Sequence, residues 1–246
     1  MKKLSVIALL LLVIVLSFGF VILKSWSRGP DENYFNRHWR VKFAAHPWLR
    51  EVLGLHFDSD GKADYLGQRY QKILIEVDIM ETLTAQVEGL EFLKQKIQEI
   101  TGKETSYIIS DRNILYDRSL TDEEIAGFVR QYRGYRNTGK VATLYLLYGS
   151  RKEGSPSLLG STYQEYGIVL FEEELKSLTG DNQKLLARYE VSTALHEFGH
   201  QLGLAHNDNF RCLMNEAVET VQVAYQDPED VIVDFCEYEK QQFKQR

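Results

Sequence analysis

The sequence predicts an α+β fold, in which a mixed, twisted β-sheet is packed with helices and follows one apolar helix at the N-terminus. Two observations predict the sheet domain. Runs rich in β-branched residues alternate with helical patterns, and 246 residues are enough to bury a full core. A third observation predicts the N-terminal helix, because residues 4–23 are apolar and uncharged. Hydrophobic residues make up 44% and charged residues 26% of the chain, which excludes a fibrous or wholly disordered protein.

The N-terminal apolar run has the length and flanks of a membrane-inserted segment. Lys2 and Lys3 precede it, and at about 1.5 Å per residue a helix of this length spans roughly 30 Å, the thickness of a bilayer core. An uncleaved anchor is favoured because the run continues to Leu23 before Lys24, whereas a signal peptide would be cleaved near Ser17-Phe18-Gly19. Either interpretation places the rest of the chain outside the cytoplasm, anchored to the membrane or secreted.

The chain divides by pattern into three parts. Residues 1–23 are the signal peptide or membrane anchor, residues 24–70 a polar N-terminal extension, and residues 71–246 a single folded domain. The net charge is −6 and no basic block stands out, so we expect no nucleic-acid partner, because binding to phosphates needs a basic face.

The first half of the folded domain alternates strands and helices. Residues 72–80 predict a strand, and residues 82–100 an amphipathic helix that ends at Gly102. Residues 104–110 predict a second strand. The run that starts at Thr121 is typical of a capping box and predicts a helix to about residue 132.

The second half places a long helix after two more strands. Residues 141–148 are almost continuously apolar, as in a strand buried on both faces, and residues 149–160 read as a loop. Residues 167–171 predict the last strand. Either Asp181 or Asn182 can cap a helix that runs to about residue 202.

A metal-binding motif lies at the end of that long helix, with the sequence HEFGHQLGLAH. His196 and His200 are one helical turn apart, so both imidazoles can reach one ion. Gly203 can adopt the left-handed conformation that ends the helix and turns the chain, which lets His206 return to the same point. Three neutral histidine nitrogens and one water form the open tetrahedral site of catalytic zinc, with Glu197 beside the water.

Chance is a poor explanation of this motif. A bare HExxH is short and occurs in helices without metal, but the full eleven-residue pattern is expected about once in 10⁵ chains of this length. The motif also falls where the apolar pattern already predicts a helix. The sequence therefore predicts a zinc site with His196, His200 and His206 as ligands.

The motif, followed closely by Cys212-Leu213-Met214-Asn215, resembles the metzincin clan of zinc metallopeptidases, closest to archaemetzincin-like and matrixin-like proteases. The resemblance implies that Met214 is the methionine of the Met-turn beneath the metal. The short gap from His206 to Met214, with a cysteine two residues before the methionine, is most similar to the archaemetzincins.

The cysteines depart from the archaemetzincin pattern, which typically has four for a second, structural zinc. This chain has Asn207 at the first of these places and only Cys212 and Cys236 besides, so we expect one catalytic zinc. In an exported domain two cysteines favour a disulfide, so we expect a bond between Cys212 and Cys236, which would tie the Met-turn to a helical stretch over residues 228–242. Free thiols, or a metal shared with other ligands, are the alternatives.

The resemblance also implies a substrate-binding strand. In metzincins the strand before the zinc helix forms the edge of the sheet above the cleft, and peptide substrate pairs with it antiparallel. Gly167, Ile168, Val169 and Leu170 occupy the matching place in this sequence.

The expected function is zinc-dependent hydrolysis of peptide bonds in peptide or protein substrates. In this mechanism a metal-bound water attacks the scissile carbonyl and Glu197 takes its proton as the general base. Two alternatives stay open: an exported zinc-binding interaction domain without peptidase activity, and a zinc hydrolase of a non-peptide or cell-wall amide. An intact Glu197 argues against the interaction domain, since metal binding alone does not need it.

Overall fold

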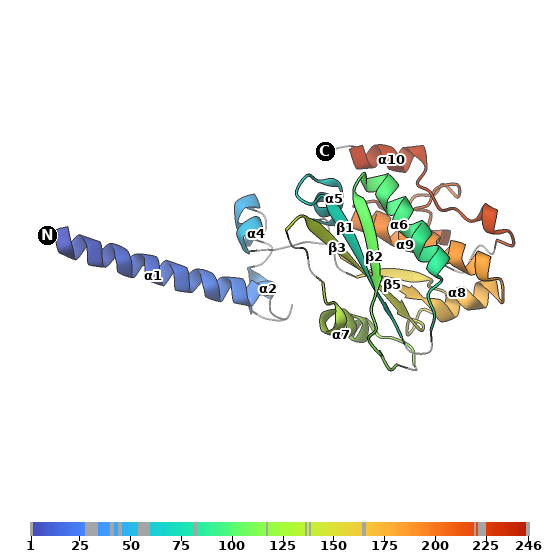
Figure 1. Cartoon of the computed structure of the whole chain (residues 1–246), viewed down its shortest axis with the longest axis horizontal. Coiled ribbons are helices and arrows are strands. Elements are labelled where there is room, and N and C mark those ends of the chain that lie inside the picture. Colours follow the sequence, from blue (N-terminus) through green and yellow to red (C-terminus); the bar gives the residue numbers. More distant parts are fainter. Residues whose placement is uncertain are drawn as a thin grey trace. The chain divides into compact units, whose positions relative to one another are not determined.

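The computed structural model describes two compact units of the chain, Met1–Phe57 and Asp58–Arg246 (Figure 1). The residues that it describes are 2–27, 34–39, 42–43, 46–53, 60–80, 83–116, 118–135, 137, 139–163, 166–218, 220 and 225–244. The second unit begins before the expected domain start at residue 71, because helix α5 (Asp60–Leu66) belongs to it. Tyr65 of α5 packs against Phe198 with ring centroids 5.1 Å apart, and its hydroxyl donates to the carbonyl of Thr143 at 3.3 Å.

The first unit is a small group of helices: α1 (Lys2–Ser27), α2 (Tyr34–His38) and α4 (Pro47–Leu53). Its apolar cluster is centred on Phe35 and Leu53, both buried, and the Ser27 hydroxyl donates to the carbonyl of Leu53 at 3.2 Å. Within the part of the chain that the structure describes, we find no helix that combines the length and the apolar character needed to cross a membrane.

The second unit is built on a five-stranded mixed sheet with the order β2-β1-β3-β5-β4. In chain order the strands are β1 (Lys72–Ile79), β2 (Glu104–Ile109), β3 (Val141–Gly149), β4 (Gly160–Tyr163) and β5 (Gly167–Phe171). All neighbouring pairs are parallel except β4 and β5, which are antiparallel. The expected α+β class with a mixed sheet is confirmed.

The predicted edge position of Gly167–Leu170 is wrong. Strand β5 lies inside the sheet, where Leu170 is the partner of Tyr148 in β3 on one side and of Gly160 in β4 on the other. All five β5 residues are buried, as is typical of an internal strand. The edge strand next to β5 is β4. It begins at Gly160, the last residue of the region that the sequence assigns to a loop.

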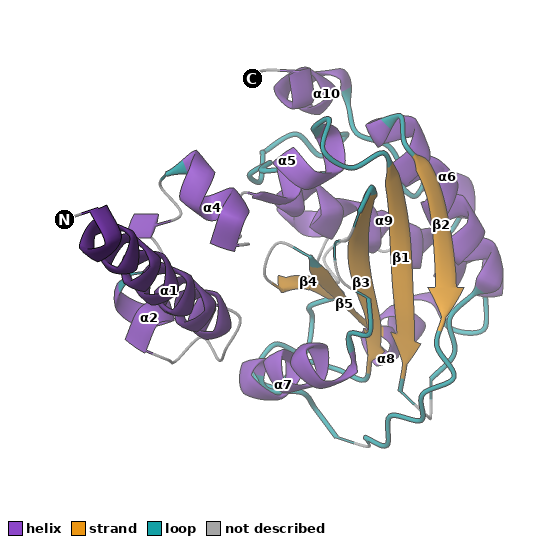
Figure 2. Ribbon diagram, turned by 60° about the vertical axis from the view of Figure 1, so that its left-hand side comes forward, coloured by secondary structure: helices purple, strands orange, loops and turns teal. Residues whose placement is uncertain are grey.

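Helices cover both faces of the sheet (Figure 2). Helices α6 (Val87–Thr101) and α9 (Gln183–Gln201) pack on one face, and α7 (Asp122–Tyr132) on the other. The remaining helices of this unit are α5, α8 (Glu172–Thr179), η1 (Glu216–Val218), η2 (Pro228–Asp230) and α10 (Glu237–Lys244). The sequence did not predict α8, and the helix expected over 228–242 is divided into η2 and α10.

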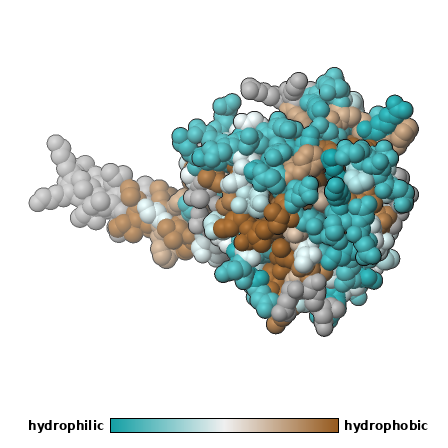
Figure 3. Space-filling model, turned by 45° about the vertical axis from the view of Figure 1, so that its right-hand side comes forward, coloured by the Kyte–Doolittle hydropathy of each residue, from teal (hydrophilic) through white to brown (hydrophobic). Residues whose placement is uncertain are grey.

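The core follows from the alternation of side chains along the central strands. Ile73, Ile75 and Val77 of β1 point to the face that carries α6 and α9, and they belong to the larger apolar cluster. The smaller cluster on the α7 face includes Tyr145 and Leu147 of β3. Figure 3 shows a largely hydrophilic surface on the face that it draws, with hydrophobic residues gathered in one patch near its middle.

The structure confirms the predicted start of α7 but not that of α6. The capping box that begins α7 is present as expected, with Thr121 and Glu124 bonded reciprocally. Helix α6 begins later than the predicted residue 82. The N–H groups of Thr84 and Gln86 instead donate to buried carboxylates of α8 and α9, so this segment is held outside the helix.

Candidate metal centre and active site

Helix α9 positions the first two histidines of the motif. The side chain of Asn182 caps it by accepting a hydrogen bond from the N–H of Leu185 at 3.1 Å, so Asn182 and not Asp181 is the cap. Nearly the whole helix is buried, and its last turns carry His196 and His200. Because these two are four residues apart, their rings lie on the same face, with centroids 4.9 Å apart.

The turn after α9 brings the third histidine to the other two. Gly203 has a φ of +85°, the left-handed conformation expected of it, and the N–H of Leu204 donates to the carbonyl of Gly199 at 3.0 Å. His206 then lies beside the helix, with its ring centroid 4.7 Å from that of His200.

The three Nε2 atoms converge on one point. The Nε2 of His206 lies 3.2 Å from that of His196 and 3.0 Å from that of His200. A tetrahedral zinc ion with Zn–N bonds of about 2.0–2.1 Å separates its ligand nitrogens by about 3.3 Å. Nitrogen lone pairs at this separation repel one another unless a cation lies between them, so the donor set fits a zinc ion.

Backbone carbonyls fix the orientation of two of these rings. The Nδ1 of His196 lies 2.7 Å from the carbonyl oxygen of Leu213, and the Nδ1 of His200 lies 3.0 Å from that of Leu204. A carbonyl oxygen can only accept, so each Nδ1 carries the proton and each Nε2 keeps its lone pair. This is the arrangement that holds histidine ligands at metal sites.

Glu197 is held by the edge strand of the sheet. Its side chain is buried, and the Thr162 hydroxyl of β4 lies 2.6 Å from its Oε2 and 3.1 Å from its backbone oxygen. Gly160 lets β4 come this close, since a Cβ there would lie 2.5 Å from the side chain of Thr193. Sequence reasoning missed Thr162, because no local pattern pairs it with Glu197.

Comparison with known proteins agrees with this geometry. Residues 149–233, which include the three histidines, match the Matrixin family model. The chain is a zinc metallopeptidase that is similar to the matrixins over these residues. Curated proteins show no match to it.

Two solved structures are similar to the metzincin-like chain. The archaemetzincin of Methanopyrus kandleri has a TM-score of 0.53 at 16% identity, over 72% of this chain and 95% of that one, which shows a shared fold. A zinc-dependent peptidase of Methanocorpusculum labreanum has a TM-score of 0.48 at 14% identity, over 69% of this chain and 99% of that one.

The methionine of the metzincin-like motif packs directly against the zinc helix. Met214 is buried, and a Cβ on Gly199 would fall on its Sδ and lie 2.9 Å from a ring carbon of Phe235. Gly199 is thus the residue that allows the two segments to meet. Sequence reasoning missed this role, although a glycine inside a helix was a usable signal, because it costs about 1 kcal/mol relative to alanine.

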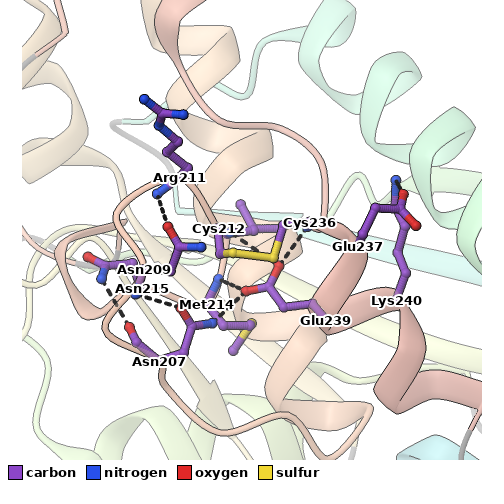
Figure 4. Close-up of a disulfide and its surroundings, with 11 residues drawn as sticks. Asn207, Asn209, Arg211, Cys212, Met214, Asn215, Cys236, Glu237, Glu239 and Lys240 are labelled. Carbon is purple, nitrogen blue, oxygen red and sulfur yellow. Dashed lines mark hydrogen bonds and ion pairs between the residues drawn. A yellow bond between two sulfur atoms is a disulfide. The ribbon is translucent and has the colours of Figure 1, made fainter.

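A disulfide joins the Met-turn of the peptidase to the start of α10. Cys212 and Cys236 are bonded, with their Cα atoms 5.1 Å apart (Figure 4). The buried carboxylate of Glu239 lies next to them and accepts hydrogen bonds from the surrounding N–H groups. Sequence reasoning missed Glu239, although its place three residues after Cys236 at a helix start resembles half of a capping box.

A small, mainly apolar pocket lies beside the zinc helix of the metallopeptidase. Its volume is about 230 Å³, and Tyr189 and Ser192 of α9 line one side of it. These residues precede His196 by seven and four positions, so they share its face of the helix. Tyr225 also lines the pocket, and its backbone N–H donates to the Tyr189 hydroxyl at 2.7 Å.

Proposed function

We propose that this zinc metallopeptidase hydrolyses peptide bonds in peptide or protein substrates at a zinc ion held by His196, His200 and His206, with Glu197 as the general base. The observation that carries this proposal is the convergence of the three Nε2 atoms, 3.0 and 3.2 Å apart, beside a buried carboxylate. A binding module would need the three imidazoles but not Glu197.

The residues of the chain divide the chemical work among them. Zinc, when bound, supplies Lewis-acid polarisation of the scissile carbonyl and makes water more acidic. Glu197 accepts the proton of the attacking water and passes it to the leaving amine. Thr162 keeps the Glu197 carboxylate in place through the 2.6 Å contact, so the base does not have to be ordered during the reaction.

We expect one zinc ion per chain. Three histidines make one site, and Cys212 and Cys236 are bonded to each other, which leaves neither thiolate as a ligand. Elemental analysis of the purified protein checks this count, and two tightly held ions would contradict it. His200→Ala should lose most of the metal, because two imidazoles form a weak site.

The edge strand β4 gives the substrate backbone a place to pair. It is the outer strand of the sheet next to β5, and it holds Glu197 through Thr162, so a peptide added along it would pass the general base. Recognition by strand addition relies on main-chain hydrogen bonds, which are available for any sequence. These two observations support Gly160–Tyr163 as the proposed binding strand.

The pocket lined by Tyr189 and Ser192 of α9 suggests a side-chain preference. Its volume of about 230 Å³ and its lining of Tyr189, Val218 and Tyr225 suit one bulky apolar side chain near the scissile bond. Substrates with leucine or phenylalanine at this place should be cleaved faster than those with aspartate.

The location of the peptidase is part of the same proposal. The apolar run at residues 4–23 after Lys2 and Lys3 would direct the second unit out of the cytoplasm, as an anchor or a cleaved signal. The disulfide supports an oxidising compartment.

Incubation with a diverse peptide library tests the proposal. Cleavage should occur with the zinc-loaded protein, stop with a chelator, and return when zinc is added back. A protein that binds zinc but leaves every peptide intact would contradict the peptidase mechanism and favour a different substrate or a binding role.

A further inference from the structure

We propose that Glu239 is a positioning residue of the metal site, which orients His196 and His206 without touching the metal. This inference rests on the proposed zinc site. Glu239 is the third residue of α10 and only 1% exposed, although a carboxylate is costly to bury. The hydrogen bonds that its two carboxylate oxygens accept account for this burial.

The carboxylate accepts hydrogen bonds from four uncharged N–H groups, and Figure 4 shows it beside Asn207, Met214 and Cys236. Oε1 accepts from the N–H of Met214 at 2.7 Å and from Asn207 Nδ2 at 2.8 Å. Oε2 accepts from the N–H of Cys236 at 2.9 Å and from that of Leu213 at 3.3 Å. Glu239 thus gathers three separate segments of the chain around one buried charge.

One peptide group connects Glu239 to the first histidine. The N–H of Met214 and the carbonyl of Leu213 belong to the same planar peptide unit. Its N–H donates to Glu239, and its carbonyl accepts from Nδ1 of His196 at 2.7 Å. The carboxylate therefore fixes and polarises the carbonyl that orients the His196 ring, and such outer partners tune the affinity of a ligand for its metal.

A second connection runs to the third histidine. Asn207 directly follows His206, and its side chain donates to the same Oε1 that holds Met214. The backbone N–H of Asn207 also donates to the carbonyl of Met214 at 2.9 Å. The segment after His206 is thus fixed to the Met-turn by the same carboxylate.

The disulfide explains how α10 reaches this place. The bond between Cys212 and Cys236 brings the first turn of α10 next to the Met-turn, with Cys236 directly before the helix. Glu239 then bonds the N–H of Cys236 and faces the Met-turn. The disulfide holds α10 next to the Met-turn, and the Glu239 carboxylate orients the peptide groups of that turn.

Zinc affinity of the full-length protein, measured by competition with a chromophoric chelator, tests this inference. Glu239→Gln keeps the size of the side chain but turns an amide donor toward N–H donors, and zinc binding should weaken roughly 10–100-fold. The visible spectrum of the Co²⁺-substituted protein should shift as the ligand geometry changes. Glu237→Gln, an exposed position on the same helix, should alter neither property.

Other outcomes would overturn the inference. Equal zinc affinity and an unchanged Co²⁺ spectrum in Glu239→Gln would show that the carboxylate does not position the ligands. Two zinc ions in the wild type and one in the variant would make Glu239 a ligand. If Glu239→Gln does not fold, Asn207→Ala is the second variant to measure. It removes only one of the hydrogen bonds to Glu239, the one from Asn207 Nδ2, and should still weaken zinc binding several-fold. Peptide cleavage is not used here, so a failure of the proposed peptidase function would be seen separately.

Discussion

The Thr162 hydroxyl lies 2.6 Å from Oε2 of Glu197, so the edge strand of the sheet holds the proposed general base. The two residues come from different layers of the fold, β4 and α9. This contact joins the surface proposed for the substrate backbone to the group that moves the proton. On the proposed mechanism β4 belongs to the reaction site as well as to the sheet.

Thr162→Val should lower kcat because the valine keeps the shape of threonine but removes the hydroxyl that orients Glu197. We expect a loss of about tenfold, the effect of one hydrogen bond of roughly 1.4 kcal/mol. Thr162→Ser keeps the hydroxyl and serves as the matched control. Steady-state kinetics on one peptide, with zinc content measured in parallel, check the prediction. Equal kcat values for the valine and serine variants would count against it.

Gly199→Ala should destabilise the protein by about 1–3 kcal/mol, because its new methyl group would overlap Met214 and crowd Phe235. The control is Gly127→Ala in α7, where a Cβ meets nothing within 4 Å. That change should stabilise the protein by about 0.5–1 kcal/mol, the ordinary gain of alanine in a helix. Chemical denaturation of both variants measures the difference. If both variants were more stable than the wild type by similar amounts, the packing of Met214 would not require a glycine at position 199.

The stability of the fold should depend on pH through Glu190. Burial, together with the nearby charge of Glu172, raises the pKa of Glu190 to about 8. The folded protein then holds a proton that the unfolded chain, with an ordinary carboxyl pKa, releases at lower pH. Stability should therefore fall as pH rises from about 4.5 to about 8, by on the order of 1 kcal/mol per pH unit from this group.

Glu190→Gln imitates the protonated form and should flatten this pH dependence. At pH 8 the variant should unfold at higher denaturant concentration than the wild type, and at pH 5 the two should be similar. Glu88→Gln, an exposed position on α6, is the control. Saturating zinc in all samples gives the wild type and the variants the same metal contribution at each pH. Parallel stability curves for the wild type and Glu190→Gln would contradict the raised pKa.

Removal of the disulfide should cost about 3–4 kcal/mol of stability, because a sequence separation of 24 closes a sizeable loop in the unfolded chain. The double variant Cys212→Ala, Cys236→Ala measures this loss in urea. Mass spectrometry of the unreduced wild type should find neither thiol labelled. Labelling at both cysteines would contradict the disulfide and the oxidising compartment inferred from it.

Local patterns predicted most of the elements and the metal motif. The β1 and β3 strands, the capping box at Thr121 and the Asn182-capped helix depend on residues close together in sequence. The spacing of His196 and His200 likewise sets their common helix face, and Gly203 supplies the turn that returns His206 through its own conformational freedom. Such features need no knowledge of the rest of the fold.

The missed features depend on contacts between distant segments. Strand β4 has only four residues and little apolar character, so its pairing with β5 is visible only in the sheet. The contact of Thr162 with Glu197 follows from that pairing. Glu239 contacts residues at least 25 positions earlier, in Asn207, Leu213 and Met214, which no local pattern indicates.

The central claim is that Glu197 performs proton transfer beside a zinc ion that it does not bind. The most direct measurement compares peptide hydrolysis and zinc content in the wild type, in Glu197→Gln and in the exposed control Glu104→Gln. Our account predicts that Glu197→Gln keeps the zinc and the fold but loses roughly 10²–10⁴-fold in kcat/KM, while the control keeps both properties. Hydrolysis by Glu197→Gln at the wild-type rate would contradict it.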